Sequence, residues 1–541
     1  MKQLCSISIF LCLLAFPAAL AADEPIDWEM VNRIRDEGFN RSRVMETLRY
    51  LTDTIGPRLT GSPALKEAND WTRDQLEQWG LENAQLEPWG PFGRGWSFSR
   101  SSAHMLEPRQ VPLMALPRGW TPGTEGPIQG TAMKVEIESE EDFEDYRGEL
   151  EGKILLLAGS REIKSPEESG FERYSPGELA ELAEFEIPPE EREEWIVKAR
   201  ERYKLSKALN EFLVAEGALA TLDISSRDNG IIRLRSAGSR EPGESVGVPS
   251  LAVAAEQYNW LVRLLEDDVE VVLEIDVVTQ FHDDDLMDYN TLAEIPGTDK
   301  RDEIVMVGGH LDSWHPGTGS NDNASGCAVA MEAVRILQAL GVRPRRTIRI
   351  GLWGGEEQGY LGSRSHIAEH YATRPEPEDP EERELPFYLW DQQWPIETKP
   401  AHAKLSGYFN LDNGSGKIRG VYTQGNAAMT LIFEAWLEPF HDLGADTVTN
   451  RDTGGTDHIP FDRVGLPGFQ FIQDKLDYFT RTHHSNLDVY DHAQREDLIQ
   501  ASVIMASFAY HAAMRDDMLP REPMPQEPPE KDDKEEEDEE Q

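Results

Sequence analysis

Short apolar runs alternate with helix-length segments through the second half of the chain, and this alternation is the strongest constraint on its fold. Runs of strand length, rich in β-branched or aromatic residues, lie at 304–307, 347–353 and 405–411. Segments with helical spacing follow the first two runs, at 323–340 and 359–371. Strands that alternate with helices of this length favour a sheet covered on both faces. We therefore predict an α/β fold with a doubly wound, mostly parallel sheet flanked by helices.

The charge balance excludes several classes of partner. The 541 residues include 53 Lys and Arg against 100 Asp and Glu, which gives a net charge of −47. A surface this acidic repels nucleic-acid phosphates and anionic membranes, so we expect neither partner. Three cysteines are too few for a disulfide framework or for a zinc site built on cysteine clusters.

The two ends of the chain have compositions of their own. Lys2, an apolar run at 7–15 and the small residues Ala19, Ala21 and Ala22 are typical of a secretory signal peptide. The apolar run is too short to span a membrane, so we expect an exported protein, periplasmic or extracellular, with no membrane span in its mature chain. Residues 516–541 are acidic and rich in proline, and we expect this tail to be disordered.

The stretch from 125 to 280 differs from the sequence on either side of it. It contains two strand-like segments, at 153–158 and 269–278, and an acidic helical stretch, but no cluster of His with carboxylates. We predict a β-rich insert at 125–280 that splits a catalytic domain made of 23–124 and 281–515. A polar, proline-rich stretch at 373–400 is expected to be a long surface excursion.

Side chains that bind metals follow the ends of the predicted strands. His310 and Asp312 follow the first strand, Glu356 and Glu357 follow the second, and Asp412 follows the third. In open α/β sheets, ligands and catalytic groups collect at the carboxyl ends of the strands. We therefore expect these five side chains to lie near one another.

Two polar loops add further candidates. Asp322 lies directly before a predicted helix, and the loop at 482–488 contains His483, His484 and Asp488. Taken alone, Asp322 is explained as a helix N-cap, and a single histidine is more often structural than a ligand. Several ligand-type side chains at element ends within one α/β domain favour a metal site over these plainer interpretations.

These motifs resemble those of the co-catalytic zinc exopeptidases of metallopeptidase family 28, the family of aminopeptidase Y, and most resemble its carboxypeptidase Q branch. The resemblance rests on the segments VMVGGHLDSW, SNDNASG, LWGGEE, FNLDN, GGTDHIPF and HHS, and on the earlier segment LTDTIGPRLTGS. It covers roughly residues 40–120 and 285–515. More weakly, the insert resembles a protease-associated domain.

The resemblance implies a site for two Zn²⁺ ions. His310 and Asp412 would bind one ion, Glu357 and His484 the other, and the carboxylate of Asp322 would bridge them. The charge supports this set, because two Zn²⁺ ions, three carboxylates and a bridging hydroxide sum to zero. The family also implies a cis peptide bond after Asp322.

The same resemblance assigns roles to residues around the metals. Glu356 would be the general base that acts on a metal-bridging hydroxide, and Asp312 would orient a metal-binding histidine by hydrogen bonding to it. Asp457 and His458 resemble a motif near the substrate, with a structural turn as the alternative. His483 remains the alternative to the histidine that follows it as a metal ligand.

The sequence therefore predicts an exported zinc exopeptidase that hydrolyses short peptides, as an aminopeptidase, a dipeptidase or a carboxypeptidase Q-like enzyme. One alternative is a non-catalytic metal-binding or interaction protein on the same fold. Another is a glutaminyl cyclase, which the fold also supports. No residue found in the sequence decides between recognition of the amino and the carboxyl end of a peptide, and a homodimer stays open.

Overall fold

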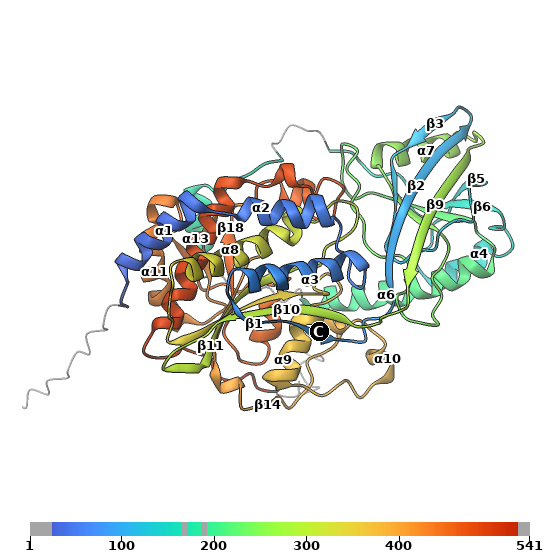
Figure 1. Ribbon diagram of the computed structural model, residues 1–541. Coiled ribbons are helices and arrows are strands. Elements are labelled where there is room, and N and C mark those ends of the chain that lie inside the picture. Colours follow the sequence, from blue (N-terminus) through green and yellow to red (C-terminus); the bar gives the residue numbers. More distant parts are fainter. Residues whose placement is uncertain (1–23, 165–169, 186–191, 529–541) are drawn as a thin grey trace, which may run out of the picture.

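Two large sheets lie side by side in the computed structural model, which describes residues 24–164, 170–185 and 192–528 (Figure 1). The predicted signal peptide and residues 529–541 lie outside these described residues. Each sheet has eight strands among the residues described. Within the same residues, none of the helices combines the length and the apolarity that a membrane span needs.

The first sheet is mixed, with a parallel centre. In spatial order its strands are β1 (Glu82–Trp89), β10 (Asp288–Ile295), β12 (Arg346–Trp353), β11 (Lys300–His310), β15 (Leu405–Asn410), β18 (Gly468–Gln473), β16 (Ile418–Tyr422) and β17 (Thr447–Thr449). Strands β12, β11, β15 and β18 are parallel to one another, whereas β1 and β10 on one side and β16 on the other pair antiparallel. The parallel centre means that the carboxyl ends of three predicted strands meet at one edge.

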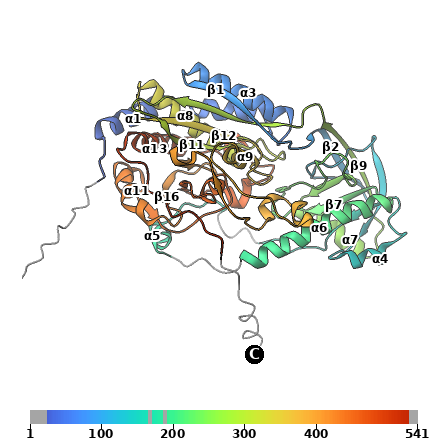
Figure 2. The same cartoon turned by 90° about the horizontal axis from the view of Figure 1, so that it is seen from below.

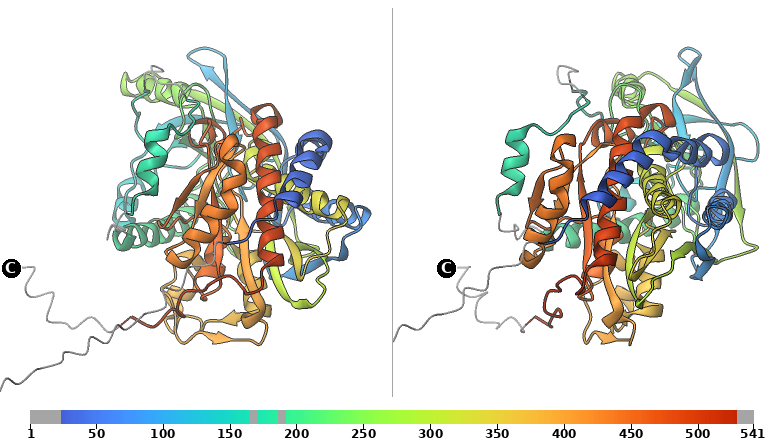
Figure 3. Two further views of the ribbon diagram at one scale, coloured as in Figure 1. Left: turned by 90° about the vertical axis from the view of Figure 1, so that its left-hand side faces the viewer. Right: turned by 60° about the vertical axis from the view of Figure 1, so that its left-hand side comes forward.

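Helices cover both faces of the first sheet. The helices on one face are α1 (Trp28–Arg41), α2 (Val44–Arg49), α3 (Pro63–Gln78), α8 (Ser325–Ala339), α11 (Thr430–Leu437) and α13 (Arg495–Met514). The other face is covered by α9 (Leu361–His370) and α12 (His458–Asp462). Along β11, Val305 and Val307 enter the first core and Met306 enters the second, as the two-residue period of a strand requires. Figure 3 shows α1, α8 and α13 packed together, and the predicted doubly wound α/β fold is confirmed.

The second sheet has a core of its own. Its strands, in spatial order, are β3 (Val111–Leu113), β2 (Gly95–Glu107), β9 (Val272–His282), β5 (Ile128–Lys134), β6 (Lys153–Leu156), β7 (Ala220–Ile224), β8 (Ser250–Val253) and β4 (Ala115–Pro117). Two helices of this part are α4 (Phe143–Tyr146) and α7 (Ala255–Glu266). Buried apolar side chains from α7 and from most of these strands pack into a single cluster, which is separate from the cores of the first sheet.

The second sheet begins earlier than the predicted insert. Strands β2, β3 and β4 lie before residue 125, and β2 pairs antiparallel with β9 along most of its length. The border placed at 125 therefore does not coincide with the border between the two sheets. The alternation of side chains in 95–107 marks a strand, but it does not say which sheet that strand joins.

Part of the predicted insert lies on the first sheet. In the segment before α5 (Pro176–Ala183), Arg173 forms ion pairs with Asp474 and Asp497 at 2.8 and 2.7 Å. Helix α6 (Arg192–Ala215) then runs back beneath the second sheet, as Figure 2 shows. Its Arg200 donates to the carbonyl of Leu389, in the excursion at 373–400 that contains β13 (Ala372–Thr373), α10 (Pro380–Arg383) and β14 (Glu397–Thr398).

The structure also corrects the start of the predicted tail. Residues 516–528 have no helix or strand, and some of them pack against the first sheet although others are exposed. Leu519 is buried, and the Arg521 guanidinium donates to the carbonyls of His402 and Leu405. The tail is acidic overall, so its composition does not indicate that Leu519 and Arg521 contact the rest of the folded chain.

Candidate metal centre

Strand ends and one turn bring three of the predicted ligands into a buried group. His310 ends β11, Asp412 follows β15, and Asp322 lies in the turn before α8. The Nε2 atom of His310 lies 3.3 Å from Oδ1 of Asp322 and 3.3 Å from Oδ1 of Asp412. All three side chains are buried.

A second group faces the other oxygen of Asp322. The Nε2 atom of His484 lies 2.9 Å from Oε2 of Glu357 and 3.3 Å from Oδ2 of Asp322. Asp322 thus presents one oxygen to each group, as a bridging carboxylate does, and the two groups are those that the family resemblance implied. His483 lies on the same side but farther away, with its Nε2 3.9 Å from Asp322 Oδ2.

The turn that carries Asp322 is held from behind by Asp488. The backbone N–H of Asn321 donates to Oδ1 of Asp488 at 2.6 Å, and that of Asp322 donates to Oδ2 at 3.2 Å. The peptide bond between Asp322 and Asn323 is cis, which confirms that prediction. Asp488 therefore positions the shared carboxylate.

Asp312 supports the turn that carries the two glutamates. Its two carboxylate oxygens accept from the backbone N–H groups of Glu356 and Glu357, each at 3.2 Å, and one also accepts from Thr60 Oγ1 at 3.0 Å. The Nδ1 atom of His310 lies 3.0 Å from the backbone carbonyl of Asp312 and 3.5 Å from its carboxylate. Asp312 thus connects the ends of β11 and β12, a role beyond the orientation of His310.

Glycines allow the elements around the metal ligands to approach closely. A Cβ atom at Gly308, two residues before His310, would lie 2.0 Å from the carbonyl oxygen of Gly351 in the neighbouring strand. A Cβ atom at Gly326, in the first turn of α8, would lie 2.1 Å from the carbonyl oxygen of Leu411. Larger residues at these two positions would push apart the elements that deliver the ligands.

Buried carboxylates outnumber the cationic groups that face them. Burial raises the pKa of Glu356 well above its usual range and also raises that of Glu357. Asp322 Oδ2 and Glu357 Oε1 are buried and have no hydrogen-bond partner among the described residues. Unpaired buried carboxylate oxygens are costly unless a cation compensates them. Imidazole and carboxylate donors without thiolates suit Zn²⁺, so the residues present fit the implied metal ions.

Asp457 and His458 lie at the start of α12 and have no exposed surface. Oδ1 of Asp457 accepts from Ser363 Oγ at 2.5 Å, and its other oxygen has no hydrogen-bond partner in the described chain. His458 Nε2 lies 2.9 Å from the carbonyl oxygen of Thr453. The contact between His458 and a nearby backbone carbonyl favours a structural role for His458 in this turn over a role in substrate binding.

Arg58 is a buried residue that the sequence analysis quoted without a role. Its guanidinium donates to five backbone carbonyls, those of Leu51, Gly56, Leu311, Thr318 and Gly319. Because two of these acceptors lie just before the turn of Asp322 and one follows His310, Arg58 stabilises the backbone behind both groups. In the sequence, the only indication of a special role for Arg58 was its place in the quoted Gly-Pro-Arg segment.

Two arginines from the second sheet's part of the chain also reach the metal centre. The segment after β7 runs beside the loop of His484, where Leu234 N–H donates to the His484 carbonyl at 3.2 Å. Arg233 Nη2 and Arg235 Nε each lie 3.5 Å from His484 Nδ1. Arg233 is half-buried and Arg235 is exposed. The two arginines are some 250 positions from His484 in the chain, so no sequence pattern connected them with the metal centre.

A small hollow opens beside the second group of ligands. It is lined by Trp314, Pro316, Asp322, His484, Ser485 and Asp488. The hollow borders both the shared carboxylate and a predicted ligand, but it is too narrow to admit a water molecule.

Comparison with known proteins identifies a family domain in the second half of the chain. Residues 290–509 match the family described as peptidase family M28. The chain contains a peptidase M28 domain. All five predicted metal ligands and Glu356 lie within the residues that match this family.

Curated relatives extend over most of the chain. Carboxypeptidase Q from Bos taurus is 29% identical over 487 residues, which cover 90% of this chain and 88% of the relative. Aminopeptidase YwaD from Bacillus subtilis is 25% identical over 282 residues, 51% of this chain and 53% of the relative. Family and relatives together support a peptidase.

Solved structures share the fold. A peptidase M28 precursor from Shewanella amazonensis covers 92% of this chain and 99% of its own, with a TM-score of 0.64 and 24% identity. BSAP, a zinc aminopeptidase from Bacillus subtilis, covers 87% of this chain and 95% of its own, with a TM-score of 0.52 and 18% identity. At these identities the likeness concerns the fold alone.

Proposed function

We propose that this protein is an exported, zinc-dependent exopeptidase that hydrolyses short peptides. The observation that carries the proposal is the position of Asp322, whose two oxygens face two separate groups of one histidine and one carboxylate. The M28 domain and the relatives named as peptidases support the reaction class. The composition of residues 1–22 supports export.

Glu356 is the group that moves the proton. The two groups that share Asp322 would hold two zinc ions, which when bound supply Lewis acidity and lower the pKa of a water molecule. Glu356 Oε2 lies 3.9 Å from His310 Nε2, beside these ligands but with no ligand role assigned to it. Its carboxylate takes a proton from the attacking water and passes it to the leaving amine. Burial raises the pKa of Glu356 above its usual range, the direction that suits a carboxylate which first accepts and then donates a proton.

The test of the proposed function is a panel of peptides incubated with the zinc-loaded protein. We expect hydrolysis of unblocked dipeptides, its loss when a chelator removes the metal, and its return when zinc is added. Zinc-loaded protein that leaves every peptide intact would support the non-catalytic binding protein. Ring closure of a peptide with N-terminal glutamine, without cleavage, would support the glutaminyl cyclase.

The two arginines suggest which end of the peptide is recognised. A pair of guanidinium groups beside His484 suits the free carboxylate of a dipeptide or of a carboxypeptidase substrate. The change Arg235→Ala removes an exposed side chain, so the fold should survive. We expect KM for free dipeptides to rise roughly 10–100-fold, because a hydrogen bond to a charged group is lost. KM for the matching dipeptide amides should stay constant.

Arg263→Ala, an exposed change on α7, is the matched control and should leave both values of KM unchanged. An equal rise in KM for acids and amides in the Arg235 variant would contradict carboxylate recognition. It would leave the exopeptidase assignment intact, because that assignment depends on the metal ligands.

A further inference from the structure

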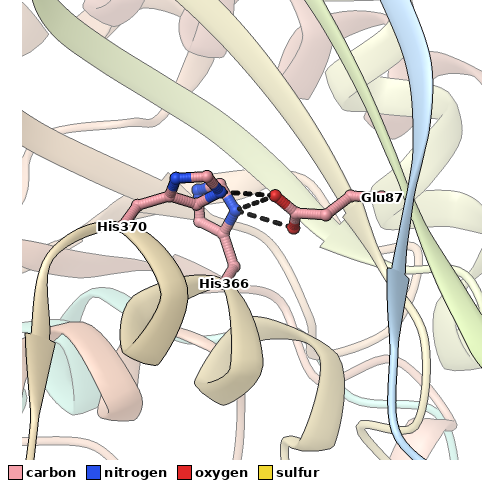
Figure 4. A group of neighbouring side chains, drawn as sticks. All are labelled: Glu87, His366 and His370. Carbon is pink, nitrogen blue, oxygen red and sulfur yellow. Dashed lines mark hydrogen bonds and ion pairs between the residues drawn. The ribbon is translucent and has the colours of Figure 1, made fainter.

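A second cluster of metal-type ligands lies between β1 and α9 (Figure 4). The Nδ1 atom of His366 lies 2.8 and 3.1 Å from the two carboxylate oxygens of Glu87. The Nε2 atom of His370 lies 2.6 Å from one of the same oxygens. Glu87 lies in β1, outside the M28 domain, and none of the three residues belongs to the candidate metal centre.

We propose that Glu87, His366 and His370 bind a divalent transition-metal ion, with zinc as the best match, at a site separate from the candidate metal centre. The two histidines are four positions apart on α9, so both rings point to one side of the helix, and Figure 4 shows them directed at Glu87. The potential ligand atoms all lie within 4.8 Å of one another. Two imidazole nitrogens and one carboxylate oxygen, completed by water, form a known ligand set for zinc.

The site is open on one side and closed on the other. The side chain of His370 is 40% exposed, which gives an ion and its water a way in, whereas that of His366 has no exposed surface. Tetrahedral ligands about 2.0 Å from zinc lie roughly 3.3 Å apart, so Glu87 would have to move away from His366 by a few tenths of an ångström and from His370 by about 0.7 Å.

Direct contact between Glu87 and the histidines leaves one buried nitrogen of this cluster without a hydrogen-bond partner in the described chain. Without a metal ion, Nδ1–H of His366 donates to the Glu87 carboxylate, and a neutral ring then has a lone pair at Nε2. Its Nε2 is buried without a hydrogen-bond partner in the described chain, and the ring packs near Trp353 and Tyr371. A hydrogen on Nε2 can interact weakly with aromatic rings, whereas a lone pair there gains nothing. A metal ion bound at Nδ1 places the ring hydrogen on Nε2, which suits these aromatic neighbours, and it replaces the direct Nδ1–H contact to Glu87.

The cluster is connected to the turn that carries Glu356. Asn290 Nδ2 donates to Glu87 Oε2 at 3.1 Å and to the carbonyl of Gly362 at 3.0 Å. Asn290 Oδ1 accepts from the backbone N–H of Gly354 at 3.2 Å. An ion held by Glu87 would therefore tie β1 to α9 and brace the turn that begins at Gly354.

The test is the zinc content of the full-length protein after zinc loading and dialysis, measured by elemental analysis. We expect His370→Ala, a change at a partly exposed side chain, to hold one zinc ion per chain fewer than the wild type, whatever the wild-type total. Glu87→Gln should lose the same ion. The control His441→Ala changes an exposed histidine elsewhere and should leave the zinc content unchanged.

Thermal unfolding supplies a second measurement. Zinc should raise the Tm of the chelator-treated wild type by more than it raises that of His370→Ala, because the variant lacks one of the bound ions. Equal zinc content in the wild type and His370→Ala would overturn the proposal. So would a decrease in Tm that is the same with and without zinc, which is the behaviour of ion pairs alone. Neither result depends on whether the protein hydrolyses peptides.

Discussion

Glu356→Gln is expected to lower kcat of the zinc-loaded protein by about 10²–10⁴-fold, the usual contribution of a general base. The amide has nearly the shape of the carboxylate but cannot accept the proton of the attacking water. The backbone N–H of Glu356, which donates to Asp312, is untouched by the change, so the turn should keep its structure. Zinc content should equal that of the wild type, because Glu356 is not one of the five predicted ligands. Steady-state kinetics and elemental analysis on the same samples measure both effects.

The neighbouring glutamates provide the controls for this change. Glu357→Gln alters a predicted ligand and should reduce zinc content together with activity. Glu369→Gln alters an exposed carboxylate on α9 and should change neither. A fully active Glu356→Gln variant would end the general-base assignment. Loss of zinc from that variant would make Glu356 a ligand instead.

His484→Ala and His483→Ala are expected to differ sharply although the two residues are adjacent. His484→Ala removes the imidazole 2.9 Å from Glu357, so we expect the loss of one zinc ion and a decrease in activity of at least about a hundredfold. His483→Ala removes a ring that lies 3.9 Å from Asp322, and it should retain the zinc of the wild type and most of the activity.

Elemental analysis and the rate of dipeptide hydrolysis measure both variants. The adjacent histidine makes an internal control, since each change removes one imidazole from the same loop. The reverse pattern, with zinc lost only from His483→Ala, would assign the ligand role to His483. Equal zinc content in both variants would remove this loop from the metal centre.

The parts of the fold that the sequence predicted well depend on short-range patterns. The strand expected at 347–353 is β12, and the helix expected at 359–371 is α9, each within a residue or two at its ends. The alternation of such elements placed His310, Glu357 and Asp412 at one edge of a sheet, because parallel strands share the edge at which they end. The structure brings these residues together with Asp322 and His484.

Other features depend on contacts between distant segments. Strand β2 joins the second sheet because it pairs with β9, about 170 positions later, and nothing in its own sequence selects that partner. The approach of Arg235 to His484 and the pairing of Glu87 with His370 arise in the same way. In each case the residues belong to no recognisable sequence motif. Their chemical role follows only from the residues that they contact in the folded chain.

By itself, the sequence determined the succession of strands and helices in the M28 domain, the candidate ligands at their ends and the acidic character of the chain. Hydrophobic period and position relative to a strand end are local properties, readable within a few residues. The tertiary structure decided which sheet each strand of the second part joins, that Asp312 and Asp488 hold the turns behind the ligands, and that Glu87 meets two histidines of α9. These outcomes depend on how segments far apart in the chain pack against one another. The free energy of that packing is distributed over many contacts, so it produces no periodic pattern in the sequence.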